Sequence, residues 1–151
     1  MVGDLRVAAY RALGLLSDGY ASTLRRFGFD GDCTILVAAD EGDRLLGTIT
    51  LEWFGPHSEL ARDDTEADLR AFAVDAEAQG QGTGRALLTA AVEHAATRGL
   101  HRIRLCTQPE MKSAQRLYAT AGFTRTPDLD WQPPGGPFLQ AYELELAPKS
   151  R

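Results

Sequence analysis

The chain has 151 residues, of which 44% are hydrophobic and 25% are charged, and its formal net charge is −5. That length suits a single domain, residues 1–151, with a sizeable core, and the acidic balance argues against general nucleic-acid binding. No stretch approaches the roughly 20 consecutive apolar residues of a membrane span, and the charged N-terminus does not resemble a signal peptide. We therefore expect a cytoplasmic protein with no membrane partner.

The charge is unevenly distributed along the chain. Residues 85–125 contain seven Lys or Arg and two acids, whereas the rest contains nine Lys or Arg and nineteen acids. A basic segment suits an anionic ligand, and an acidic remainder suits a cationic partner. The two cysteines, Cys33 and Cys106, lie far apart and outside any CxxC or Cys/His cluster. We expect free thiols, no disulfide and no metal site.

The first half of the chain predicts helices and then strands. The predicted elements are short helices at 4–14 and 17–27, strands at 33–40 and 44–54 joined by a turn at 41–43, and a strand at 67–74. In the second strand, Thr48, Thr50 and Glu52 alternate with apolar residues, so they should share one face and leave the other for the core. An acidic loop precedes the third strand.

The second half alternates helices and strands. The predicted elements are a helix at 82–99, a strand at 101–107, a helix opened by Pro109 and capped by Gly122, and a strand at 138–146. The first of these helices carries an apolar stripe and ends at Gly99. The whole order, ααβββαβαβ, predicts an α/β domain with a mixed α+β sheet, in which antiparallel strands precede a strand–helix–strand crossover.

Gly80, Gly82 and Gly84 stand directly before the helix at 82–99. Successive N–H groups at a helix N-terminus bind anions, and glycine permits close approach of a pyrophosphate that a Cβ would block. The loop lacks the Lys and Ser/Thr of a Walker loop. It also differs from a Rossmann fingerprint, because three strands precede it and no acid ends the next strand. Taken alone, the loop is a weak signal, because a plain flexible turn could have the same sequence.

A second segment, AQRLYATAGF at 114–123, follows the glycine loop. Together with AVDAEAQGQGTGRALL at 73–88, it resembles the two signature segments of the GNAT superfamily of acetyl-CoA-dependent N-acetyltransferases. The family's [QR]xxGx[GA] pattern is matched by Gln79, Gly82 and Gly84. Its A-x-x-LY and GF pattern is matched by Ala114, Leu117, Tyr118, Gly122 and Phe123. The resemblance covers 33–146 in element order and is specific over 69–123.

The resemblance implies the GNAT acyl-CoA N-acyltransferase fold, with two splayed central parallel strands and acetyl-CoA as the cofactor. The cofactor's pantetheine arm would lie in the gap beside 105–107, against the main chain of Phe72, Ala73 and Val74. Its pyrophosphate would lie against Gln79, Gly80, Gln81, Gly82, Thr83, Gly84 and Arg85. Many members carry an Asn where this chain has Met111. The contact of that Asn side-chain amide with the cofactor arm would therefore be missing, unless Ser113 supplies part of it.

The resemblance also implies the reaction: direct attack of a primary amine on the thioester. Tyr118 would lie near the sulfur and act as general acid, and a strand N–H near Phe72 to Val74 would stabilise the oxyanion. A carboxylate should take the ammonium proton. Glu52 is the first candidate, with Glu66 and Asp68 behind it, although Glu52 could simply be solvated and Tyr118 simply a packed aromatic.

Family members usually begin with a strand, whereas this chain opens on a helix, so we expect the first strand to be missing. The resulting sheet edge could be covered by a second copy in a homodimer. The acceptor would be a small-molecule or peptide amine, and Trp53, Phe54 and Trp131 could line its pocket. Two alternatives stay open: a non-catalytic acyl-CoA-binding or sensing domain, which would not need Tyr118, and a flavin- or nicotinamide-binding α/β protein.

Overall fold

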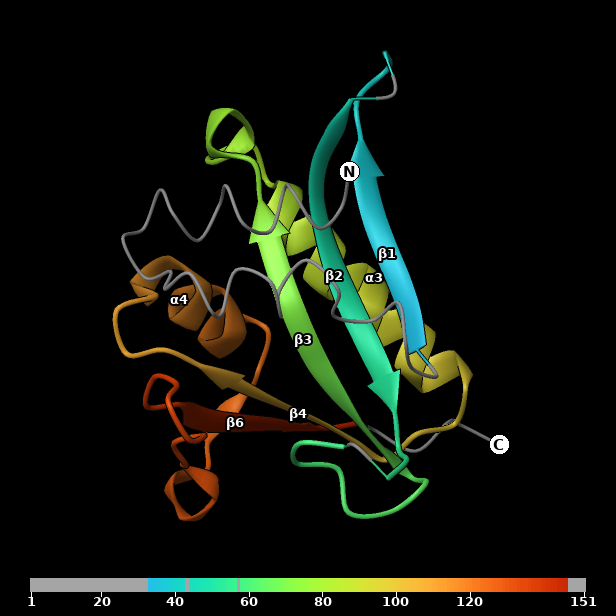
Figure 1. Ribbon diagram of the computed structural model, residues 1–151. Helices are drawn as coiled ribbons and strands as arrows, with labels where there is room; N and C mark the ends of the chain where they lie inside the picture. The colour runs from blue at the N-terminus through green and yellow to red at the C-terminus, as the bar shows by residue number, and fades with distance from the viewer. Residues whose placement is uncertain (1–32, 43, 57, 147–151) are drawn as a thin grey trace.

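A computed structural model describes residues 33–42, 44–56 and 58–146 (Figure 1). Its strands are β1 (Cys33–Ala39), β2 (Leu45–Trp53), β3 (Glu66–Val74), β4 (Arg102–Thr107), β5 (Thr124–Arg125) and β6 (Gln140–Glu145). Its helices are α3 (Thr83–Thr97) and α4 (Lys112–Thr120), with short 3-10 turns η1 (Ala76–Ala78) and η2 (Pro127–Leu129). The predicted helices at 4–14 and 17–27, and the question of a missing first strand, lie outside the described residues.

The six strands form one sheet in the order β1-β2-β3-β4-β6-β5. Neighbouring strands are antiparallel except β3 and β4, which are parallel and joined by α3. A parallel pair needs such a crossover, whereas β1 and β2 are joined by a tight turn. The predicted mixed α/β fold, with antiparallel strands before a strand–helix–strand unit, is confirmed.

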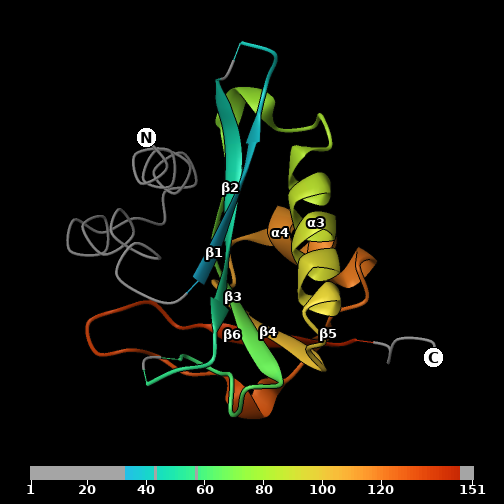
Figure 2. The ribbon, with the colours of Figure 1, turned by 90° about the vertical axis from the view of Figure 1, so that its right-hand side faces the viewer.

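Helices α3 and α4 lie on the same face of the sheet (Figure 2). The core between these helices and the sheet includes Ile49 and Leu51 of β2, together with Leu87, Ala91 and Ala95 of α3. The predicted alternation of β2 is confirmed, because these apolar residues face the core and the alternate residues lie on the other face. A Cβ on Gly47 would come within 2.8 Å of Leu87 Cδ1 and 3.0 Å of the Ala73 carbonyl oxygen, so glycine is needed where α3 crosses β2.

The structure gives the boundaries of two helices that the sequence predicted. Helix α3 ends as predicted, with Gly99 at a φ of +85° directly after the Arg98 C-cap. Helix α4 begins at Lys112 rather than at Pro109, because Pro109 lies in a turn that Gln115 holds from inside the helix. The Gln115 side-chain amide donates hydrogen bonds to the carbonyl oxygens of Gln108 (2.9 Å) and Pro109 (3.2 Å).

Both cysteines lie within the described residues, Cys33 on β1 and Cys106 on β4, and neither forms a disulfide. In the described ranges, neither helix combines the length and the apolar character that crossing a membrane would require. Strand β5 has two residues, too few to show a period, and the sequence did not predict it.

Candidate active site

The parallel strands β3 and β4 separate at their C-terminal ends. Their pairing runs from Glu66–Arg102 to Leu69–Leu105 and stops there. Beyond that point β3 continues beside β2 to Val74, and β4 continues beside β6 to Thr107. Figure 1 shows the two strands diverging. The gap that the family resemblance implied is therefore present, at the sheet edge where α/β proteins commonly bind ligands.

A β-bulge shapes the β3 side of this gap. Thr48 pairs with Ala73 and Thr50 pairs with Arg70, so β3 contains one more residue than β2 over this stretch. Ala71 within the bulge has a φ of +54°, and no other non-glycine residue in the described ranges has a positive φ. Such a left-handed residue costs on the order of 1–3 kcal/mol, and strain of this kind clusters at functional sites.

The hydrogen bonds at the end of β3 show which way its main chain points. The Asp75 N–H donates to the Leu46 carbonyl oxygen at 2.7 Å, so the polar groups of Asp75 face β2. Along a strand, the N–H and carbonyl groups of successive residues point alternately toward one neighbouring strand and toward the opposite side. The N–H and carbonyl of Val74 therefore point away from β2 and toward the gap, and alternation predicts the same for Phe72.

A groove of about 480 Å³ runs from this gap to the N-terminus of α3. The predicted cofactor residues that line it are Phe72, Ala73, Val74, Gln79, Gly80, Gly82, Thr83, Gly84, Arg85 and Ser113. Gln81 does not line it, and Tyr118 lies in an adjoining pocket instead. The sequence prediction omitted Ala78, Met111, Ala114 and Leu117, which complete the wall. Ala114 and Leu117 share a helix face with Tyr118, so helical periodicity could have found them.

The three loop glycines serve two different purposes. Gly80 and Gly82 each have a φ of +82°, and a Cβ on either would meet no atom within 4 Å. Gly84 has no such φ, but its Cβ would lie 3.0 Å from Leu117 Cδ1 and 3.3 Å from Phe72 Cζ. The expectation that these glycines keep a Cβ away from a ligand stays a prediction, and the structure adds a conformational or packing reason for each. Two allow a left-handed turn, and the third allows close packing of α3.

The N-terminus of α3 is suited to an anion. Its N-cap is Gly82, no side chain caps it, and its first turn contains no acid. The first hydrogen bond of the helix runs from the Ala86 N–H to the Gly82 carbonyl oxygen at 3.0 Å. The N–H groups of Thr83, Gly84 and Arg85 precede it and have no intrahelical acceptor. With the exposed Arg85 beside them, these groups fit the phosphates of a pyrophosphate.

A second, smaller pocket of about 50 Å³ opens on the other side of Phe72 and Met111, which line both cavities. Its further lining residues are Glu59, Leu69, Arg70, Ala71, Cys106, Thr107, Gln108, Tyr118 and Leu139. The Tyr118 ring packs against Phe72 and Phe123, with centroids 6.2 and 5.8 Å away. Burial raises the pKa of the Tyr118 phenol well above its usual value, so the hydroxyl is protonated at neutral pH.

Two glutamates share one arginine at this pocket. Arg70 contacts Glu59 at 3.1 Å and Glu52 at 3.4 Å. Of the two, Glu59 lines the pocket and Glu52 does not. Burial raises the pKa of Glu59, and Arg70 only partly opposes that shift. The sequence prediction missed Glu59, because it is one of four acids in the loop at 56–66 and nothing in their spacing distinguishes it.

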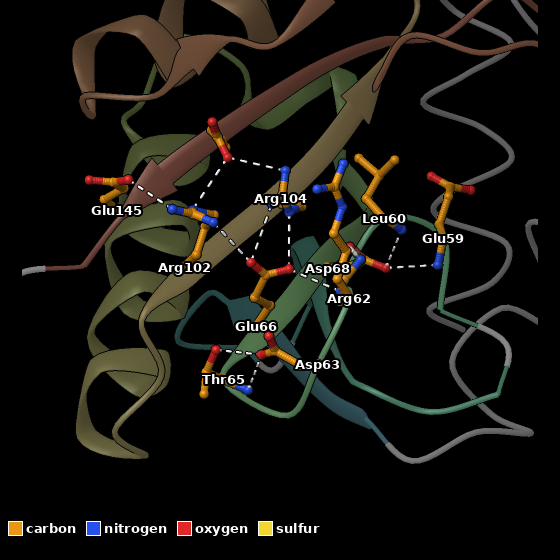
Figure 3. A network of polar contacts seen from close by, with 12 residues as sticks. Glu59, Leu60, Arg62, Asp63, Thr65, Glu66, Asp68, Arg102, Arg104 and Glu145 are labelled. Carbon is orange, nitrogen blue, oxygen red and sulfur yellow. Dashed lines mark hydrogen bonds and ion pairs between the residues drawn. The ribbon is translucent and has the colours of Figure 1, made fainter. Parts of the chain in front are cut away.

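The other two carboxylates considered from the sequence stabilise the structure (Figure 3). Asp68, 1% exposed, accepts hydrogen bonds from the N–H groups of Glu59, Leu60 and Ala61 at 2.9–3.0 Å. Glu66 accepts from the Arg62 N–H and from the guanidinium groups of Arg102 and Arg104. Asp68 thus fixes the loop that carries Glu59, and Glu66 belongs to an ion-pair network across β3, β4 and β6.

The aromatic residues proposed for an acceptor pocket differ in their surroundings. Trp53 is 8% exposed in the core, with the Arg98 guanidinium 3.9 Å from its ring centroid. Phe54 is exposed, and Trp131 pairs with Leu139 through the main chain. None of the three lines the small pocket. Burial strongly raises the pKa of the Cys106 thiol, so the thiol is protonated at neutral pH and is a poor nucleophile.

Comparison with known proteins identifies the class of protein. The model of the acetyltransferase (GNAT) family matches residues 4–123, so the chain belongs to that family. A mycothiol acetyltransferase of Actinosynnema mirum is 35% identical over 97 residues, which are 64% of this chain and 30% of that protein. One of Kocuria rhizophila is 33% identical over 91 residues, 60% of this chain and 29% of that protein. The chain thus spans about 30% of the length of these curated relatives.

Solved structures support the same fold at low sequence identity. A GNAT acetyltransferase from Staphylococcus aureus Mu50 has a TM-score of 0.74 and 18% identity, covering 97% of this chain and 91% of that one. The PaiA N-acetyltransferase from Thermoplasma acidophilum, solved with coenzyme A, has a TM-score of 0.66 and 17% identity, covering 93% and 89%. An aminoglycoside 6'-N-acetyltransferase, also solved with coenzyme A, has a TM-score of 0.68 and 14% identity, covering 99% and 93%.

Proposed function

We propose that this chain is an N-acetyltransferase that moves the acetyl group of acetyl-CoA to a primary amine by direct attack. One observation carries the proposal: an uncapped helix N-terminus opens into a groove that ends at the β3–β4 gap, beside the pocket of Tyr118. The groove would thereby join a phosphate-binding end to a reaction end. Family membership supports the same donor.

The donor would be held mainly by the main chain. The N–H groups of Thr83, Gly84 and Arg85 would receive the pyrophosphate, with the helix dipole adding about 0.3–1 kcal/mol. The main-chain groups of Val74 that face the gap would bind the amides of the pantetheine arm. Ala114 and Leu117 supply apolar wall on the opposite side.

Acetyl-CoA would supply a thioester whose carbonyl becomes an oxyanion on attack. The main-chain N–H of Phe72 or that of Val74, which face the gap, would donate to that oxyanion. The Tyr118 hydroxyl would donate to the departing thiolate. Its raised pKa keeps the proton available but makes it a weaker acid than an ordinary phenol, so its contribution should be moderate. Glu52 is the base predicted from the sequence.

The curated relatives are named mycothiol acetyltransferases, but each matches this chain over less than a third of its own length. The acceptor is therefore best inferred from this chain's own pocket. A small-molecule or peptide amine fits the proposal, and the acidic charge outside residues 85–125 favours a cationic one.

A two-part experiment tests the proposal. Acetyl-CoA and CoA should each raise the melting temperature, as expected for ligands that bind only the folded state, whereas NAD should not. A thiol-release screen over a panel of amines should then identify at least one acetylated acceptor. Stabilisation by NAD and not by CoA would refute the donor. Stabilisation by CoA without transfer to any amine would favour the non-catalytic acyl-CoA-binding alternative.

A further inference from the structure

Thr107, the last residue of β4, is a polar residue in an apolar series. Side chains along a strand alternate between its two faces, so Thr107 shares a face of β4 with Ile103 and Leu105, which both lie in the core. Thr107 is nearly as buried as they are, with 3% of its surface exposed. An apolar side chain would suit these surroundings, because a buried hydroxyl costs free energy unless it is hydrogen-bonded. A hydroxyl at this position therefore indicates a hydrogen-bonding role.

The Thr107 hydroxyl has no hydrogen-bond partner among the residues that the structure describes. Most buried polar side chains in folded proteins are hydrogen-bonded, so an unpartnered one at a cavity wall points to a ligand. Thr107 lines the small pocket. It lies two residues beyond Leu105, where the pairing of β3 with β4 ends and the two strands diverge (Figure 1). The hydroxyl can therefore contact a group that enters the gap between these strands.

The Glu59 carboxylate is a second polar group of the same pocket. Its side chain is 14% exposed, and Arg70 contacts it at 3.1 Å. An ionised carboxylate accepts up to about four hydrogen bonds and donates none, so the ion pair leaves capacity for a ligand. The pocket has a volume of about 50 Å³, against roughly 10–15 Å³ for one water molecule on the same measure. A small group inside it can therefore reach both Thr107 and Glu59.

Two groups of the proposed reaction are candidates for this position, the thioester carbonyl and the nitrogen of the acceptor amine. A carbonyl oxygen only accepts hydrogen bonds, so it suits the Thr107 hydroxyl but not the neighbouring carboxylate of Glu59. An amine N–H donates, and both the hydroxyl and the carboxylate can accept from it. The combination of the two side chains thus favours the acceptor nitrogen over the thioester carbonyl.

We propose that the Thr107 hydroxyl and the Glu59 carboxylate hold the nitrogen of the acceptor amine, each by accepting a hydrogen bond from it. The inference rests on the proposed function and adds two residues that bind its acceptor. A neutral primary amine has two N–H groups and one lone pair. When Thr107 and Glu59 accept from the two N–H groups, the lone pair stays free to attack the acetyl carbon. Thr107 thus binds and orients the substrate and exchanges no proton with it.

Two variants of Thr107 test the proposal, with the amine that gives the highest kcat/KM in the thiol-release panel as the acceptor. Thr107→Val removes the hydroxyl and keeps the shape of the side chain. Loss of one hydrogen bond should raise the KM of the amine by about 3–10-fold. The kcat and the Kd of acetyl-CoA should stay near the wild-type values, because the bond holds the acceptor both before and during attack. Thr107→Ser keeps the hydroxyl and should keep the wild-type KM to within about twofold.

A variant of Glu59 tests the second hydrogen bond. Glu59→Gln replaces a charged acceptor of hydrogen bonds by a neutral one, and bonds to charged groups are about twice as strong. The KM of the same amine should therefore rise by about 3–10-fold. The Kd of acetyl-CoA should again not change, because Glu59 does not line the groove.

The melting temperature separates ligand binding from a structural role of the hydroxyl. Because the Thr107 hydroxyl has no partner within the described ranges, Thr107→Val should melt no lower than the wild type, although its KM is raised. Thr126→Val is the matched control. The Thr126 hydroxyl is also buried and unpartnered in the described part of the chain, but Thr126 lines neither the groove nor the small pocket. This variant should keep the wild-type KM and also melt no lower.

Several results would overturn the proposal. An unchanged KM in Thr107→Val or in Glu59→Gln would show that the side chain does not contact the amine. A lower kcat with an unchanged KM in Thr107→Val would assign the hydroxyl to the thioester carbonyl instead. A lower melting temperature of Thr107→Val with wild-type transfer would show that the hydroxyl only stabilises the fold. Failure of the wild type to acetylate any amine of the panel would instead refute the proposed function itself.

Discussion

The groove and the small pocket meet at Phe72 and Met111 but are built from different groups. The groove presents main-chain N–H groups, two left-handed glycines and short apolar side chains. The pocket presents charged side chains from a loop and from β3, held by ion pairs and by one buried aspartate.

The groove and the small pocket differ in how far their recognition of a ligand depends on side chains. Main-chain groups at a helix N-terminus recognise a phosphate whatever the side chains are, so that half of the site depends on local conformation. Side chains on a loop can be exchanged without altering the sheet, so that half can be adapted to a particular acceptor. Variants in the two regions should therefore affect different constants.

The largest effect on turnover is expected from Tyr118→Phe. The variant keeps the ring packed against Phe72 and Phe123 and loses only the hydroxyl. Because the phenol has a raised pKa, kcat should fall by about 10–100-fold, at or below the low end for general acids. The Kd of acetyl-CoA and the melting temperature should barely move. Unchanged turnover in a steady-state assay would leave Tyr118 as a core residue.

The next effect distinguishes the glycines of the groove. Gly82→Ala places a side chain at a φ of +82° with open space around it, so acetyl-CoA binding should weaken by about tenfold through strain in the loop. Gly84→Val meets Leu117 and Phe72 instead, so it should lower the free energy of unfolding by about 1–3 kcal/mol. Calorimetric titration and denaturant unfolding measure the two quantities. Wild-type stability of Gly84→Val would contradict the packing described here.

Glu59→Gln should change the free energy of unfolding in a pH-dependent way. A carboxyl whose pKa is raised on folding binds its proton more tightly when folded. Its contribution to stability is present at low pH and is lost as the pH rises through the folded pKa. Glutamine does not titrate, so the variant should gain stability relative to the wild type between pH 4 and pH 7.5. A variant less stable than the wild type at pH 7.5 would show that the Arg70 ion pair dominates.

The smallest effect is expected at Arg44, which joins the β1–β2 hairpin to the turn before the glycine loop. Its guanidinium contacts Glu77 at 2.7 Å and also pairs with Asp75. Exposed ion pairs contribute little, so Arg44→Ala should weaken acetyl-CoA binding by no more than a few-fold. A loss of tenfold or more in a binding titration would show that this ion pair positions the loop.

The sequence predicted the sheet and the groove because both depend on local patterns. Strand β2 follows alternation of side chains, β1 and β3 are short apolar runs, and the loop before α3 follows from its glycines. The start of α4 and strand β5 were missed, since a proline turn and a two-residue strand carry no period. Glu59 was missed for a further reason: its place depends on Asp68, nine residues later, which gathers the loop N–H groups. A contact of this kind between a loop and a strand produces no regular spacing of residues in the sequence.

Hydrogen exchange during a coenzyme A titration tests most directly whether the groove binds the donor and the pocket does not. The N–H groups of Val74 and of residues 83–85 face the groove in the present account, so they should become protected when coenzyme A is added. The N–H groups of residues 59–61 are already bonded to Asp68 and should exchange as before. Protection at 59–61 with none at 83–85, or no protection at either segment, would contradict the assignment.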